Sequence, residues 1–320
     1  MIRLLPVFLA LCCAMASASA QTWPSKIIKM IVPFGAGSTT DIVPRLIFDQ
    51  LGPQLGQTIV VENRAGAGGT IGATAVARSE PDGYTLLVNS NAHTVAPAFY
   101  PGLAYDPARD FVAVVPLGTS PGVLVVSPAR GFKSIADLVA AAKAKPGSLN
   151  FSSVGVGSAT HLSAERFRVS AGLDMVHVPF KGGAEAMSEV IAGRIDFFFG
   201  PAGLVVQQVR DGKLLALVQN GATRASAFPD VPTTREAGFV DAEFPIWFGL
   251  FAPAKTPPAI VEKLHDEALK AIGSPKVAEK LANLGVDPMP MSSHEFGKFI
   301  EREIAANAAL VKAAGIKPPQ

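Results

Sequence analysis

The chain has 320 residues, of which 17% are charged, and its formal net charge is +2. A balance so close to neutral excludes a protein that binds nucleic acid or another polyanion through bulk charge, and no stripe of basic and aromatic residues marks a nucleic-acid surface. The length exceeds what one hydrophobic core usually serves, so we expect two domains.

The first twenty residues have the pattern of a secretory leader. Arg3 gives a positive start, residues 4–16 form an apolar run, and residues 18–20 form a small-residue cleavage pattern. The apolar run is shorter than the roughly twenty residues that a membrane-spanning helix needs. We therefore predict a cleaved signal peptide over residues 1–20 and a mature protein in the periplasm. Both cysteines lie in this leader, so the mature chain is expected to have no thiol or disulfide chemistry.

The rest of the chain alternates short apolar strands, Gly-rich turns and helical stretches. The predicted strands cover residues 27–34, 58–62, 85–89, 112–117, 123–127, 149–153, 175–179, 195–199, 214–219 and 246–251. Predicted helices end near residues 51, 78, 171 and 192, and others cover residues 134–145, 258–272 and 294–314. Strands that alternate with helices of this length indicate the α/β class with parallel sheets.

Two sheets of similar size fit this length. We assign residues 21–121 and 246–320 to a first lobe and residues 122–245 to a second lobe. The apolar run that ends the first of these segments leads into the second lobe, and the run that begins at Ile246 returns from it. On this assignment the C-terminal helices rejoin the first lobe.

Four glycine-containing loops each follow a predicted strand and precede a helix, at residues 35–39, 66–72, 155–160 and 181–183. Glycine permits a tight turn and the close approach of a ligand. The helix start offers unpaired N–H groups and a partial positive charge, so such loops bind anions without charged side chains. In open α/β sheets, ligands lie at the carboxyl ends of the strands. One such loop is more often structural, but four of them predict a shared anion-binding cleft.

Motifs for nucleotide binding and for catalysis are missing. Ile71 occupies the third glycine position of a dinucleotide-binding fingerprint, and no P-loop occurs in the sequence. No G-x-S-x-G nucleophile elbow is present, and Ser158 and His161 have the spacing of a helix cap. The five histidines form no metal-binding motif. We therefore expect no cofactor, no metal and no enzymatic activity.

Four side chains keep two interpretations each. His93 and His161 lie in predicted cleft loops, where each either contacts the ligand or makes local hydrogen bonds. Asp41 caps the first helix, faces the ligand, or does both. Trp247, in the predicted return strand, either packs in the core or lines the cleft.

Several segments occur in an order that is characteristic of one family. They are PSKIIKMIVPFGAGSTTD, VVENRAGAGGTIGA, PDGYTLL, AHTVAPAFY, AKPGSLNFSSVGVGSATHL, VHVPFKGGAEAM, PDVPTTREAGF and WFGLFAPAKTP. From about residue 23 to residue 316 the chain resembles the extracytoplasmic receptors of tripartite tricarboxylate transporters, the Bug family. The resemblance implies a periplasmic-binding-protein type II-like fold, in which two lobes joined by crossover strands close on a ligand. It also implies a small carboxylate held by backbone amides, often with ordered water, and delivery to a two-component membrane permease. We expect a monomer.

The loop pattern and the resemblance together define the expected binding site. Its residues are Phe34, Gly37, Ser38, Thr39, Asp41, Ser90, Asn91, His93, Gly157, Ser158, Ala159, Thr160, His161, Phe180, Gly182, Gly200 and Pro201.

Three positions depart from the family pattern. Ser38 replaces a glycine, and its hydroxyl is expected to bind the ligand or to narrow the pocket. Pro44 replaces an alanine, which predicts that the helix begins no earlier than about Thr40. Residues 196–201 lack the polar pair that many members of the family carry after this strand, so this end of the cleft is expected to be apolar. An aromatic or longer-chain acid therefore becomes a candidate ligand beside citrate-like acids and dicarboxylates. Two other functions stay open, a ligand sensor for a membrane kinase and, with less support, a secreted hydrolase.

Overall fold

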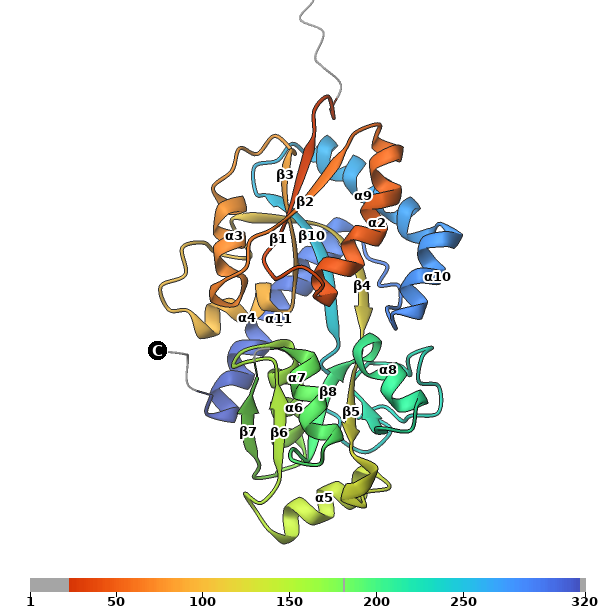
Figure 1. Cartoon of the computed structure of the whole chain (residues 1–320). Helices are drawn as coiled ribbons and strands as arrows, with labels where there is room; N and C mark the ends of the chain where they lie inside the picture. Colours follow the sequence, from red (N-terminus) through yellow and green to blue (C-terminus); the bar gives the residue numbers. More distant parts are fainter. Residues whose placement is uncertain (1–22, 181, 317–320) are drawn as a thin grey trace, which may run out of the picture.

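The computed structural model describes residues 23–180 and 182–316 and contains two five-stranded sheets, drawn one above the other in Figure 1. We name the sheet β2-β1-β3-β10-β4 with its helices lobe 1, and the sheet β7-β6-β8-β5-β9 with its helices lobe 2. The strands of lobe 1 are β1 (Ile28–Val32), β2 (Ile59–Asn63), β3 (Thr85–Ser90), β4 (Phe111–Ser120) and β10 (Ile246–Pro253). Those of lobe 2 are β5 (Gly122–Val126), β6 (Asn150–Ser153), β7 (Val176–Pro179), β8 (Phe197–Pro201) and β9 (Leu215–Gln219). The predicted leader and its cysteines lie outside the described residues.

Both sheets are mixed, and the antiparallel strand is the one that crosses between the lobes. In lobe 1, β1 pairs in parallel with β2 and β3, whereas β10 runs antiparallel to β3 and β4. In lobe 2, β6 pairs in parallel with β7 and β8, whereas β5 runs antiparallel to β8 and β9. The expectation of purely parallel sheets is therefore wrong for β5 and β10. Each of these strands enters its sheet from the other lobe, so it runs against its neighbours.

The helices of lobe 1 are α2 (Thr39–Leu55), α3 (Thr70–Ala77), α4 (Ala92–Phe99), α9 (Pro258–Gly273), α10 (Pro275–Asn283) and α11 (Ser293–Ala314), with the 3-10 turn η1 (Ala67–Gly69). Lobe 2 has α5 (Ile135–Ala144), α6 (Ala159–Ser170), α7 (Gly183–Ile191), α8 (Ala202–Arg210) and the 3-10 turn η2 (Pro128–Arg130). None of the helices in the described part of the chain is long and apolar enough to cross a membrane.

Three helices, α4, α8 and α10, are absent from the sequence-based prediction. Each has only eight or nine residues and no side-chain hydrogen bond at its N-cap. Helix α4 also contains Pro97. The signals that announce a helix in a sequence are thus weak here. Helix α2 begins at Thr39, one residue before the predicted limit, so Pro44 is its sixth residue and lies just beyond the first turn.

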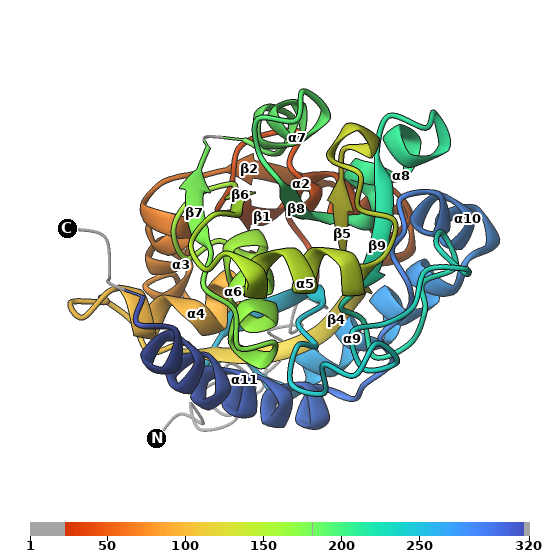
Figure 2. The same cartoon turned by 90° about the horizontal axis from the view of Figure 1, so that it is seen from below.

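Each lobe has its own apolar cores, and one small cluster joins the two lobes. Helices α4 and α11 contribute Val95, Phe99, Leu310 and Val311 to this cluster, and α6 contributes Leu162. Helix α11 packs on α4 and β4 of lobe 1, and it also contacts α6 of lobe 2. Figure 2 shows α11 running along one side of the molecule past both α4 and α6. The C-terminal helix therefore bridges the lobes.

Two buried asparagines hold the segments that cross between the lobes. Asn220 accepts a hydrogen bond from the Gly122 N–H (2.6 Å) and donates one to the Phe244 carbonyl (2.8 Å). Asn91 accepts from the Trp247 N–H and donates to the Pro245 carbonyl, both at 3.1 Å. Asn220 thus links the outgoing and returning segments, whereas Asn91 fixes the returning segment to the start of α4.

Candidate ligand-binding site

A cavity of about 800 Å³ lies between the lobes and is lined by both. Lobe 1 contributes residues 34–40, Gly68, Ser90, Ala92, Val95, Ala96, Phe99, Tyr100, Ile246 and Phe248. Lobe 2 contributes Val154, residues 156–160, residues 182–184, Pro201 and Leu204. None of these described lining residues is Asp, Glu, Lys, Arg or His. The polar groups that these residues offer to a ligand are therefore backbone groups and hydroxyls.

The first polar wall is the loop between β1 and α2, with the sequence GAGSTTD over residues 35–41. Gly37 has φ of 80°, a conformation that favours glycine. Its N–H turns away from the cavity and donates to the Asp41 carboxylate at 2.9 Å. The N–H groups of Ala36, Thr39 and Thr40 donate to no other described residue. They stay available for a ligand at the start of a 17-residue helix.

The Asp41 carboxylate holds this loop in place through hydrogen bonds. Its carboxylate accepts hydrogen bonds from Arg45 at 2.8 Å and from the Asn63 amide at 2.9 Å, in addition to the one from Gly37. Burial pushes the pKa of Asp41 up, but the bonds from Gly37, Asn63 and Arg45 outweigh it and lower the pKa overall. The carboxylate stays ionised and holds the loop. Asp41 does not line the cavity, so of its two expected roles the structure supports the local one.

The loop between β6 and α6 repeats this construction in lobe 2, with the sequence GVGSATH over residues 155–161. Gly157 has φ of 78°, and its N–H donates to Nδ1 of His161 at 3.1 Å. The N-cap residues Ser38 and Ser158 have nearly identical backbone angles, φ −69° and ψ 158° against φ −68° and ψ 159°. Here too, the N–H groups of Val156, Ala159 and Thr160 donate to no other described residue. The cavity thus has one amide loop on each side.

The two serine hydroxyls differ. Ser158 Oγ donates to the Gly155 carbonyl at 2.7 Å and accepts from the His161 N–H at 3.3 Å. Ser38 Oγ is inaccessible to solvent and has no hydrogen-bond partner within the described structure. Ser38, a lining residue, therefore carries a hydroxyl that no described residue satisfies.

Several expected site residues lie outside the cavity lining, namely Asp41, Asn91, His93, His161, Phe180 and Gly200. His93 is fully buried between Tyr105, Phe111 and Phe251, and its Nε2 donates to the Pro107 carbonyl at 3.1 Å. Burial lowers the pKa of His93 to about 4. The expectation that His93 lies in a cleft loop is corrected, because α4 turns its side chain into lobe 1.

Trp247 packs in the core rather than in the cavity. It is 1% exposed and lies edge-on to Phe296 and Phe299 of α11. Its neighbours along β10, Ile246 and Phe248, line the cavity instead. Phe199 is likewise fully buried, so the apolar run 197–199 builds the core of lobe 2, and only Pro201 of this segment reaches the cavity.

The apolar wall of the cavity was not predicted from the sequence. Helix α4 supplies Val95, Phe99 and, just after its end, Tyr100, and lobe 2 supplies Val156 and Leu204. The spacing of Val95 and Phe99, four residues apart in AHTVAPAFY, is the helical signal that could have placed them on one face. Burial raises the pKa of Tyr100, so its phenol is protonated at neutral pH.

One serine–histidine pair lies next to the second loop. Ser153 Oγ lies 2.6 Å from His177 Nε2, but Ser153 is fully buried and also bonds the Gly155 backbone. It does not line the cavity, so no substrate placed there contacts its hydroxyl. Among the described residues, no group of three or more His, Cys, Asp or Glu side chains has the arrangement of a metal site.

The mixed sheets, the crossing strands and the cavity between the lobes define a solute-binding protein of the periplasmic-binding-protein type II-like fold. Residues 43–316 match the family model described as tripartite tricarboxylate transporter family receptor, and the chain belongs to this family.

Its relatives agree with this assignment. BugT of Bordetella pertussis is 35% identical over 99% of this chain and 98% of its own length. An R. palustris protein solved with adipate matches with a TM-score of 0.83 and 32% identity, over 93% of this chain and all of that one. MatC from Rhodopseudomonas palustris, solved with bound malate, matches with a TM-score of 0.80 and 34% identity, over 90% of this chain and all of that one.

Proposed function

We propose that this protein captures a small carboxylate between its lobes and delivers it to a tripartite tricarboxylate-type transporter. The observation that carries the proposal is the pair of matching amide loops, GAGSTTD and GVGSATH, in a cavity whose described lining residues have no charged side chain. Each loop leaves three N–H groups unpaired at a helix start, which suits an anion. The structures of relatives with adipate and with malate support the same ligand class.

The ligand that fits best carries a carboxylate and an apolar body. Two amide loops suit a di- or tricarboxylate, and the wall of Val95, Phe99, Leu204 and Phe248 suits an aliphatic or aromatic spacer. Each hydrogen bond to an ionised carboxylate contributes about 1.5–3 kcal/mol. A few such bonds give roughly micromolar affinity after the cost of ordering the ligand and the loops.

The remaining assignments belong to the same proposal. The protein works in the periplasm as a monomer after removal of residues 1–20, and its partner is a two-component membrane permease. The lobes are taken as residues 21–121 with 246–320, and residues 122–245. We propose no enzymatic activity, because the described lining residues of the cavity offer no nucleophile paired with a base.

Proline substitution tests the amide loops directly. Thr39 and Ala159 are the first residues of α2 and α6, where proline fits a helix. Ala159→Pro removes only the N–H, whereas Thr39→Pro also removes a hydroxyl that lines the cavity. The preceding Ser38 and Ser158 already have the extended backbone that proline requires. Ser293→Pro, at the first residue of α11 behind a similarly extended Ser292, is the control outside the cavity, and it also removes the Ser293 hydroxyl that donates to the Ala113 carbonyl.

Isothermal titration with a panel of mono-, di- and tricarboxylic acids measures the effect. We expect saturable one-to-one binding of at least one acid, weakened by about tenfold or more in Thr39→Pro or Ala159→Pro and unchanged in Ser293→Pro. Native mass spectrometry of freshly purified protein would identify an acid that is carried along. Binding only of amines or sugars, or equal affinity in all three variants, would overturn the proposal.

A further inference from the structure

In the amide loop between β6 and α6, one backbone N–H group bonds inside the protein and is not offered to a ligand. The N–H of Gly157 points into the protein and donates to Nδ1 of His161. The His161 ring is 3% exposed and does not line the cavity. Because an N–H donates to Nδ1, this nitrogen carries no proton, and the ring is neutral with its hydrogen on Nε2.

The surroundings of the ring favour this form. The ring stacks on His177 with 3.9 Å between the centroids, and the Phe151 ring lies nearly parallel to it at 6.3 Å. Burial, together with the nearby His177 and Arg168, lowers the pKa of His161 to about 3. The protonated ring, which has no acceptor for Gly157, is therefore strongly disfavoured.

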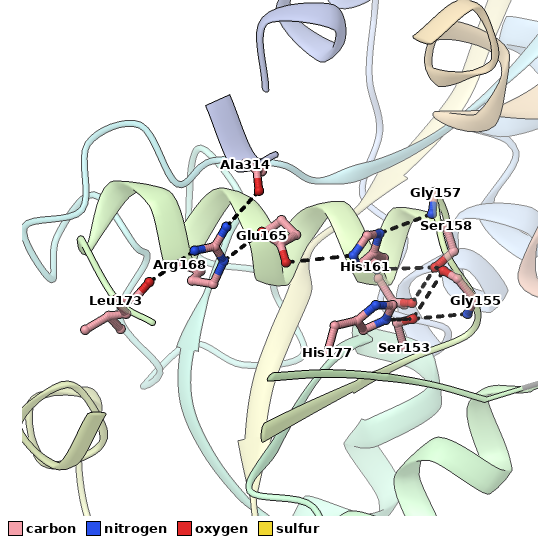
Figure 3. A network of polar contacts seen from close by, with 11 residues as sticks. Ser153, Gly155, Gly157, Ser158, His161, Glu165, Arg168, Leu173, His177 and Ala314 are labelled. Atoms are coloured by element: carbon pink, nitrogen blue, oxygen red, sulfur yellow. Dashed lines mark hydrogen bonds and ion pairs between the residues drawn. The ribbon is translucent and has the colours of Figure 1, made fainter. Parts of the chain in front are cut away.

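A row of polar side chains along α6 lies behind the ring, as Figure 3 shows. Nε2 of His161 faces the Glu165 carboxylate at 3.8 Å, and Glu165 in turn pairs with Arg168 at 2.8 Å. Arg168 also donates to the carbonyls of Leu173 and Ala314, both at 3.2 Å, and Ala314 is the last residue of α11. A carboxylate behind one ring nitrogen commonly sets which nitrogen carries the proton.

The hydrogen bond from Gly157 to His161 determines which backbone N–H groups of the loop face the ligand. If Gly157 were not held, the loop could turn that N–H toward the cavity and move its neighbours. With Gly157 held, the open donors are those of Val156, Ala159 and Thr160. Phe99 of lobe 1 lies so close to Gly157 that a Cβ at this position would come within 3.2 Å of the Phe99 ring.

We propose that His161 is a positioning residue of the binding site: it withdraws the Gly157 amide and thereby presents the Val156, Ala159 and Thr160 amides to the carboxylate. Glu165, which pairs with Arg168, lies behind Nε2 of His161 and favours the form of the ring that carries its proton there. The inference rests on the proposed function, since it assigns the way in which the second loop is prepared for its ligand. It also gives His161 the same part that Asp41 plays in the first loop, with a neutral ring in place of a carboxylate.

Two substitutions separate positioning from a merely structural role. In His161→Asn the side-chain oxygen takes the place of Nδ1 and can accept the Gly157 N–H, whereas His161→Leu fills similar space without an acceptor. We expect carboxylate affinity within about threefold of wild type for asparagine and a loss of about tenfold or more for leucine. Amide hydrogen exchange of Gly157 should be slow in wild type and His161→Asn and fast in His161→Leu.

A third measurement needs neither a variant nor a ligand. Long-range ¹H–¹⁵N correlation spectra of the wild-type protein should show Nδ1 of His161 as the unprotonated nitrogen at neutral pH. A proton on Nδ1, or a folded His161→Leu with wild-type affinity and a protected Gly157 amide, would overturn the inference. If wild-type protein binds no carboxylic acid, the proposed function fails, and the nitrogen assignment with Gly157 exchange still decides whether His161 holds the loop.

Discussion

Replacing His93 by glutamine should flatten the dependence of stability on pH. His93 is fully buried, and burial lowers its pKa from 6.5 to about 4 in the folded protein. The unfolded chain takes up a proton near pH 6.5, whereas the folded chain resists protonation until about pH 4. The stabilisation from the neutral ring is thus complete above pH 6.5 and is lost as the pH falls from 6.5 toward 4.

The magnitude follows from these two pKa values. At pH 5, protonation of this one side chain in the unfolded chain lowers the unfolding free energy by about 2 kcal/mol. At pH 7 this contribution nearly vanishes. Glutamine does not titrate, and its amide can reach the Pro107 carbonyl that Nε2 of His93 contacts. The comparison therefore isolates the charge of the ring from its packing against Phe251 and Tyr105.

Urea unfolding at pH 7 and at pH 5, followed by tryptophan fluorescence, measures the difference. Wild type should lose about 2 kcal/mol more unfolding free energy between the two pH values than His93→Gln does. His161 and His177, whose pKa values are also lowered, to about 3 and about 4, contribute equally to both proteins and cancel. An identical pH dependence in the two proteins would refute the reasoning.

Three further substitutions test the segments that cross between the lobes, a helix cap and a loop. Asn220→Ala removes a side chain that bonds Gly122, Ser163 and Phe244, and should lower the unfolding free energy by about 3 kcal/mol; a loss under about 1 kcal/mol in urea unfolding would contradict this. Ser134→Ala breaks the capping box of α5 and should cost about 1 kcal/mol in the same assay, with ligand affinity unchanged; weaker binding would show that α5 acts on the cavity. Gly157→Ala places a side chain at φ of 78° and 3.2 Å from the Phe99 ring, so titration should show weaker carboxylate binding, and wild-type affinity would speak against the loop geometry.

The two amide loops were predictable because their chemistry is local. A strand, a glycine turn and a helix start follow one another in each, and the repeated G-x-G-S pattern needs no tertiary information. The order of the strands along the chain also follows from apolar runs. The direction of β5 and β10 does not, because it depends on the lobe from which each strand arrives.

The roles of the histidines could not be read in the same way. His93 and His161 occupy similar positions, shortly after a strand end, and only their distant partners separate them. His93 meets Pro107 and Phe251, whereas His161 meets the turn four residues before it and His177. The apolar wall was missed for a related reason, since the eight-residue α4 has few sequence signals and its inner face depends on packing against α11.

The junction between β4 and β5 limits how this protein can move. Strand β4 ends at Ser120 in one sheet, and β5 begins at Gly122 in the other, with Pro121 alone between them. A linker of one residue cannot extend, and Asn220 joins it by hydrogen bonds to the segment that returns to lobe 1. The lobes can therefore rotate about this linker but cannot slide past each other. Any such rotation must also loosen α11, which contacts α4 and β4 of lobe 1 and α6 of lobe 2.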